Sequence, residues 1–140
     1  MSQQQENLNR LKAAYSTWND SKGGSTSVWE ELMADTVRLV SVEEGTSGLD
    51  FARKRSSRQG VLEYLSGILN NWDMVHVTPE TYVAEGDNIA MFGRAAWRNK
   101  QTAKVADCRV AVLGKFQGDK AVEFTDLFDS AVAAKAAMPD

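Results

Sequence analysis

The chain has 140 residues, which is the size of a single domain and is enough to bury a core without a disulfide or a structural metal. Hydrophobic residues make up 43% and charged residues 25%, which argues against disorder, and a net charge of -3 gives no reason to expect nucleic-acid binding. The polar start MSQQQENLNR lacks the apolar stretch of a signal peptide, no apolar run is long enough to cross a membrane, and the single Cys108 fits a reducing compartment. We therefore expect one cytoplasmic domain over residues 1–140 without membrane contact, with flexible tails at about residues 1–7 and 135–140.

The first stretch has the spacing of an amphipathic helix that ends near "NDSKGG". Its apolar side chains recur every three or four residues, at Leu8, Leu11, Tyr15 and Trp18. Ser27 and Glu30 have the S-x-x-E spacing of a capping box, which predicts a short second helix. A strand over residues 36–42 should follow.

A third helix should begin at Ser56 or Ser57, because a serine there can accept a hydrogen bond from the first turn. Its apolar side chains, which include Val61, Leu65 and Ile68, form one buried stripe.

Four long strands are predicted in the second half of the chain, over residues 74–86, 88–99, 103–116 and 120–128. The short connections "EGDN", "NKQT" and "QGDK" carry turn residues, so consecutive strands should be antiparallel neighbours. Helices that precede a long antiparallel meander indicate an α+β fold with the helices on one face of the sheet. A sheet of long strands curls, so a cavity open at one end can remain between the sheet and the helices.

Five segments in this order resemble the nuclear transport factor 2-like superfamily, and most closely its SnoaL-like, ketosteroid-isomerase-like branch. They are "LKAAYSTWNDS", "ELMADTVRLVSV", "RQGVLEYLSGIL", "VAEGDNIAMFGRAAWRN" and "GKFQGDKAVEFTDLFDSA", and the similarity runs from about Leu8 to Ala133. The resemblance implies a cone-shaped α+β fold, in which a curved antiparallel sheet wraps around three helices and a deep apolar pocket. It also implies frequent homodimers that pack through the sheet. It does not imply one reaction, because members isomerise, cyclise, dehydrate, hydrolyse epoxides or only bind.

The resemblance also places the isomerase residues on this chain. Tyr15 falls where ketosteroid isomerases have the tyrosine that stabilises an oxyanion. The general-base position falls on Val40 or Ser41, neither of which can accept a proton at neutral pH, and the second donor position falls near Val112. We therefore expect no efficient steroid isomerase.

The last strand contains an acid among apolar side chains. Because side chains alternate along a strand, four residues share one face: Val122, Phe124, Asp126 and Phe128. If that face looks inward, Asp126 lies on the pocket wall, and its pKa is raised by burial unless a cation compensates it. Asp126 is then either an acid–base group or half of a structural ion pair with Arg94 or Arg38, unless a bulge turns it outward. We predict a contact between Asp126 and Arg94, directly or through one water, because isolated buried charges are costly.

The candidate catalytic residues are thus Asp126 and Tyr15. The candidate ligand-binding residues are Tyr15, Trp18, Arg38, Val40, Arg94, Val112, Phe124 and Phe128. No metal is expected, since no His/Cys/Asp spacing supplies convergent ligands, and no cofactor is expected. The pattern leaves open whether His76 and Trp97 face the pocket.

These residues favour a protein that binds or transforms a small apolar or amphipathic molecule by cofactor-free acid–base chemistry. The alternative is a non-catalytic module that only binds a ligand or dimerises. A homodimer is predicted because apolar side chains occur on or near the strand face opposite the expected core, at Ile89, Met91, Trp97, Val105, Leu113 and Leu127.

Overall fold

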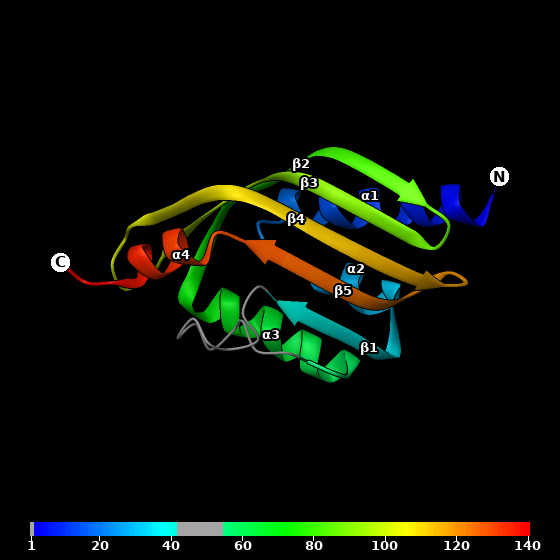
Figure 1. Ribbon diagram of the computed structural model, residues 1–140. Helices are drawn as coiled ribbons and strands as arrows, with labels where there is room; N and C mark the ends of the chain where they lie inside the picture. Colours follow the sequence, from blue (N-terminus) through cyan, green and yellow to red (C-terminus); the bar gives the residue numbers. More distant parts are fainter. Residues whose placement is uncertain (1, 42–54) are drawn as a thin grey trace.

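The computed structural model describes residues 2–41 and 55–140. Its elements follow one another in the order α1 (Gln3–Asp20), α2 (Ser27–Leu32), β1 (Met33–Ser41), α3 (Arg58–Asn71), β2 (Trp72–Glu85), β3 (Asn88–Asn99), β4 (Val105–Gln117), β5 (Lys120–Phe128) and α4 (Ser130–Ala137). Figure 1 shows a long, bent sheet with the helices α1 to α3 packed beside it and α4 at one end. This is the α+β architecture that the order of helices and strands predicts.

The five strands form one sheet in the order β1-β5-β4-β3-β2. Strands β2 to β5 pair as antiparallel neighbours, as their short connections require. Strand β1 joins the sheet beside β5 and runs parallel to it. The turn signals could not give this pairing, because most of the chain separates β1 from β5.

Three helices begin at side chains that accept a backbone hydrogen bond, which satisfies donors that the first turn leaves free. Ser2 caps α1, Ser57 caps α3 and Asp129 caps α4. The cap at Ser57 is one of the two that the sequence predicts for α3. The capping box predicted at Ser27 does not form, since α2 begins one residue earlier than that box requires and Thr26, which takes the cap position, makes no capping bond through its side chain.

The chain near the N-terminus belongs to α1 and is not a free tail. Asn7 is only 2% exposed, and its side-chain amide donates a 2.9 Å hydrogen bond to the carbonyl of Gly118 in the β4–β5 turn. At the other end, α4 continues to Ala137. The expected tails at residues 1–7 and 135–140 are therefore partly helical in the structure.

The core lies between α1, α2 and α3 and the inner face of the sheet. Ile89 and Met91 of β3 are each 1% exposed and belong to this core, so placing them on a dimer face was wrong. The reason is the register: Phe92 pairs with Ala111, and Ala111 pairs with Leu127. Even-numbered residues of β3 therefore share the outer face with odd-numbered residues of β4 and β5.

Candidate functional site

A cavity of about 180 Å³ lies between the inner face of the sheet and the helices. Its wall is mainly aromatic and aliphatic, and it includes all four tryptophans of the chain: Trp18, Trp29, Trp72 and Trp97. Among the residues that the structure describes, the wall contains one carboxyl group and no lysine, arginine or histidine. A concave apolar site with few polar groups is the usual form of a small-molecule pocket.

The carboxyl group in this wall belongs to Asp126, on the inner face of β5. The hydroxyl of Tyr64, from α3, donates a 2.6 Å hydrogen bond to its Oδ2 atom. Asp126 keeps some accessible surface because it borders the cavity, but protein surrounds it closely enough that burial raises its pKa above the ordinary value of 3.8. The hydrogen bond from Tyr64 acts in the opposite direction, because it stabilises the ionised form.

The predicted contact between Asp126 and Arg94 is wrong. Arg94 lies on the outer face, where its Nη2 atom is 3.1 Å from Oδ1 of Asp107 and its side chain is 40% exposed. Arg38 also lies outside the cavity, and its Nη1 atom is 3.7 Å from Oε1 of Glu123. Both arginines thus pair with carboxylates on the surface, and neither compensates the charge of Asp126.

The structure brings most of the remaining predicted site residues together. The cavity wall includes Tyr15, Trp18, Val112, Phe124 and Phe128. Val40 is not part of the wall; its neighbour Leu39 lines the cavity in its place, because alternation along β1 turns Leu39 inward. Trp97 faces the cavity, which resolves the alternatives that the sequence left open.

Asp126 lies between the two positions at which the resemblance places isomerase groups. On one side it pairs with Ser41 of β1, one of the two residues on which the general-base position falls, and on the other with Val112 of β4, near which the second donor position falls. Directly paired residues of neighbouring strands project from the same face. The carboxyl group that is absent from both matched positions is therefore present on the strand between them.

Tyr64 is the important site residue that sequence analysis did not single out. It is three residues after Val61 and four before Ile68, so helical spacing places it on the buried stripe of α3. What the sequence does not show is that this stripe faces the inner side of β5. Burial, and after it the charge of Asp126, raises the pKa of Tyr64 well above 10.0, so its phenol is a neutral donor.

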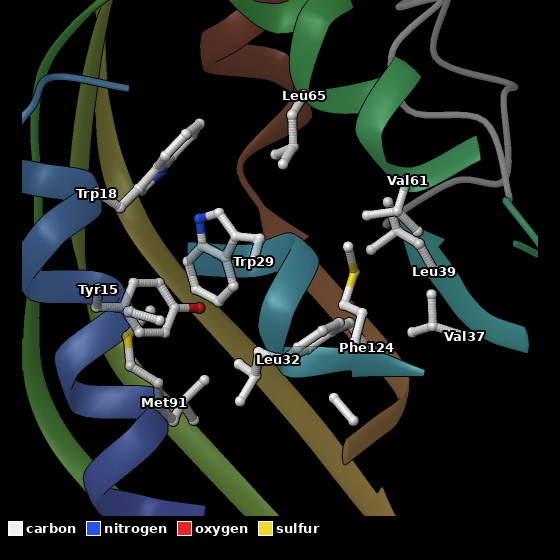
Figure 2. Close-up of a cluster of buried hydrophobic side chains, with 14 of the residues drawn as sticks. Tyr15, Trp18, Trp29, Leu32, Val37, Leu39, Val61, Leu65, Met91 and Phe124 are labelled. Carbon is white, nitrogen blue, oxygen red and sulfur yellow. The ribbon is translucent and has the colours of Figure 1, made fainter. Parts of the chain in front are cut away.

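Tyr15 is a second neutral phenol in the wall. Burial raises its pKa well above 10.0, and the nearby charge of Asp126 adds to this effect. Figure 2 shows its oxygen directed inward from α1, next to Trp29, and the two rings meet edge to face with their centroids 4.9 Å apart. The hydroxyl forms no hydrogen bond with any residue of the described ranges, so it is available to a ligand.

The other titratable side chains singled out in the sequence lie at the edge of the site or beyond it. Cys108 lines the cavity, and burial raises the pKa of its thiol, which is therefore neutral at pH 7. His76 does not line the cavity, and its Nδ1 atom is 3.0 Å from Oγ1 of Thr78. Within residues 2–41 and 55–140, no three His, Cys, Asp or Glu side chains lie close enough together to hold a metal ion. No helix in these ranges has the length and apolar character needed to cross a membrane.

The family description "SnoaL-like domain" matches residues 11–124, which is most of the chain. The chain belongs to the SnoaL-like domain family. No curated protein matches this SnoaL-like protein.

Solved structures share the fold over nearly the whole length. An NTF2-like protein of unknown function from Burkholderia pseudomallei has a TM-score of 0.81 at 16% identity, with 99% of each chain covered. A putative SnoaL-like polyketide cyclase from Jannaschia has a TM-score of 0.77 at 13% identity, covering 100% of this chain and 97% of the other. A protein with a ketosteroid isomerase-like fold from Catenulispora acidiphila, in complex with trimethylamine, has a TM-score of 0.71 at 16% identity, covering 90% of this chain and 93% of the other. At these identities the similarity shows the fold alone.

The raised pKa of Asp126 predicts how stability depends on pH. Its folded pKa lies above 3.8, so the folded protein binds the proton more tightly than the unfolded chain. The resulting stabilisation is complete below pH 3.8 and is lost as the pH rises through the folded pKa. Urea unfolding at a series of pH values should show that the advantage of wild type over Asp126→Asn falls with rising pH.

Asp107→Asn is the matched control, since it removes an exposed carboxyl on the outer face. It should keep the pH dependence that Asp126 causes. A difference between wild type and Asp126→Asn that grows as the pH rises would show that the ionised carboxylate is the favoured form in the fold.

Proposed function

We propose that this SnoaL-like protein binds a small, largely apolar molecule with a polar group and transforms it by cofactor-free acid–base chemistry at Asp126. The observation that carries the proposal is a single buried carboxyl group, held by the Tyr64 hydroxyl at 2.6 Å, in a cavity wall whose described residues include no cation. Burial raises the pKa of this carboxyl toward neutrality, which is the direction that favours a general acid or base working near pH 7.

Each polar group has a distinct role in this proposal. Asp126 takes up one proton and gives one back: between substrate atoms in isomerisation and cyclisation, from a carbon to the departing hydroxyl in dehydration, and from the attacking water to the released oxygen in hydrolytic ring opening. Tyr15, a neutral donor, stabilises negative charge that develops on a substrate oxygen. The hydroxyl hydrogen of Tyr64 is used in the short hydrogen bond, so it does not contact the substrate. Tyr64 holds one carboxyl oxygen of Asp126 and leaves the other for the reaction.

The names of the structural relatives agree with this class of chemistry, since they include a putative polyketide cyclase and putative isomerases. The cavity volume sets how much of a substrate is enclosed. A cavity of about 150 Å³ holds benzene, and this one measures about 180 Å³, so it encloses about one ring, and a four-ring molecule would extend out of it.

The alternative function is ligand binding without catalysis. It is favoured by one observation: the position of the family's general base falls on Val40 or Ser41, and neither side chain can take up a proton. The two functions differ in whether the carboxyl of Asp126 can reach the reacting atom of a bound molecule.

A generic proton-transfer probe separates the two functions. In 5-nitrobenzisoxazole, a base removes the proton on the ring carbon, the N–O bond breaks, and a coloured nitrile phenolate forms. We expect catalysis above the buffer rate that rises with pH as Asp126 ionises and falls by about 10²-fold or more in Asp126→Asn. Asp107→Asn is the control and should retain the activity, because its carboxyl lies on the outer face. Equal rates in wild type and Asp126→Asn would leave ligand binding as the better account.

We further propose that a second copy of the chain covers the outer face of the sheet. Neighbouring strands place Leu127, Ala111 and Phe92 in one row, and Leu113, Ala90 and Val83 in the next. Four of these side chains are large and exposed by 43% to 54%: Val83, Phe92, Leu113 and Leu127. A contiguous apolar patch of this kind on a sheet is typical of a protein–protein interface.

Sedimentation velocity at micromolar concentration should therefore give a dimer of the 15.4 kDa chain. Replacing both Phe92 and Leu127 by Glu places charge in the centre of the patch and should shift the protein to a monomer. The replacement of Glu63 by Lys, at an exposed position of α3, is a control for a change of surface charge away from the patch. A wild-type monomer under these conditions would contradict the proposed dimer.

A further inference from the structure

Of two hydrogen-bond donors in the cavity wall, Tyr64 has a partner in the described residues and Trp29 has none. The hydroxyl of Tyr64 is occupied by Asp126. The indole Nε1–H of Trp29 is buried and has no hydrogen-bond partner within residues 2–41 and 55–140. Buried tryptophan N–H groups usually have a partner, so this donor calls for an explanation.

Trp29 comes from α2 and is surrounded by the aromatic part of the wall. It meets three rings edge to face: Tyr15 at 4.9 Å, Phe124 at 6.1 Å and Trp18 at 6.2 Å between centroids. These contacts fix the plane of the indole, and the side chain is 7% exposed. In Figure 2 the nitrogen edge of Trp29 is turned toward the space between Trp18 and Leu65, and both of these residues line the cavity.

The two free groups near Trp29 can both donate. An indole N–H can only donate, and the neutral phenol of Tyr15 beside it can donate as well as accept. A ligand that satisfies the Trp29 N–H must therefore bring an acceptor, such as an oxygen atom. Because the described wall offers no cation, and Asp126 would repel an anion, the acceptor belongs to an uncharged group such as a ketone, an aldehyde or an ester.

The volume limits the size of the part of the ligand that the cavity encloses. Since about 150 Å³ accommodates benzene, a cavity of about 180 Å³ accommodates one ring with a small substituent. The four indoles and the other rings of the wall favour a flat, apolar body, because aromatic faces and edges pack well against such a molecule.

We infer that the Nε1–H group of Trp29 is a specificity-determining donor, which binds the carbonyl oxygen of an uncharged ligand about one ring in size. This inference rests on the proposed small-molecule function of the cavity and adds the ligand class and the residue that selects it. The nitrogen is shielded from water in the structure, so binding needs a side-chain adjustment at Trp18 or Leu65 of the kind that is common when ligands bind.

A matched pair of probes tests the inference directly. Acetophenone has a carbonyl on a single ring, and isopropylbenzene has the same size and shape without the acceptor. In ¹⁵N-labelled protein the four tryptophans give separate indole N–H signals, and the signal absent from Trp29→Phe identifies Trp29. We expect acetophenone to move the Trp29 proton signal downfield, as formation of a hydrogen bond does, and isopropylbenzene to cause no downfield change.

The dissociation constants from the same titrations give a second readout. Trp29→Phe should raise the dissociation constant of acetophenone about tenfold, which is the loss expected for one hydrogen bond. The dissociation constant of isopropylbenzene should change less than about threefold. Trp18→Phe is the matched control: it removes an indole from the same wall and should change both probes by a similar factor.

The remaining outcomes are also decisive. Equal changes for both probes in Trp29→Phe would overturn the role of Trp29 and leave the acid–base proposal for Asp126 intact. An upfield Trp29 signal that acetophenone does not move would show that the N–H is satisfied by the ring face of Trp18. Absence of binding by both probes at millimolar concentration would overturn the ligand class. If Trp29→Phe does not fold, the variants Trp18→Phe, Trp72→Phe and Trp97→Phe assign the other three indole signals, Trp29 follows by elimination, and the shift of its wild-type signal decides.

Discussion

The site depends on one carboxyl group that has no cation beside it among residues 2–41 and 55–140. Asp126 sits in an aromatic cavity wall, where the hydroxyl of Tyr64 donates a 2.6 Å hydrogen bond to it. Arg38 and Arg94, which sequence analysis proposed as its partners, pair with Glu123 and Asp107 on the surface instead. A buried carboxyl group without a cation responds by a raised pKa, because charging it in a poorly polar site costs free energy. An ion pair with Arg38 or Arg94 would have fixed Asp126 as a structural carboxylate, whereas pairing of both arginines elsewhere leaves a group that can exchange a proton.

The sheet explains how Asp126 reaches this place. Strand β5 lies between β1 and β4, so its inner face is central in the wall, and its neighbours at the level of Asp126 are Ser41 and Val112. The fold offers equivalent inward positions on three adjacent strands, and this chain uses the middle one for its carboxyl group. Helix α3 then supplies Tyr64 from across the cavity, and α1 supplies Tyr15. The same scaffold can therefore hold acid–base groups in different arrangements, and the family alone does not fix the reaction.

Local patterns predicted the elements well because each pattern has a local cause. The bounds expected for β3 and β5 agree with the structure, since turn residues flank β3 and precede β5, and the helix cap Asp129 follows β5. Alternation along β5 correctly placed Asp126 on the inner face. Local patterns could not show that Arg94 is not the partner of Asp126. The face on which Arg94 lies depends on the register between β3 and β4. The same register placed Ile89 and Met91 in the core and Phe92 outside. Tyr64 and Trp29 acquire their roles only when helices and sheet meet, so no spacing within the sequence could reveal them.

The central claim is that Asp126 is a buried carboxyl group whose proton is held more tightly than in water. The most direct test is a pH titration of the ¹³C carboxyl signal of Asp126 in the wild-type protein, assigned by its absence from Asp126→Asn. The account predicts a midpoint above the ordinary value of 3.8, with a further increase in Tyr64→Phe, because that variant removes the hydrogen bond that favours the ionised form. A midpoint at or below 3.8 would show that another group stabilises the carboxylate, and it would contradict the account.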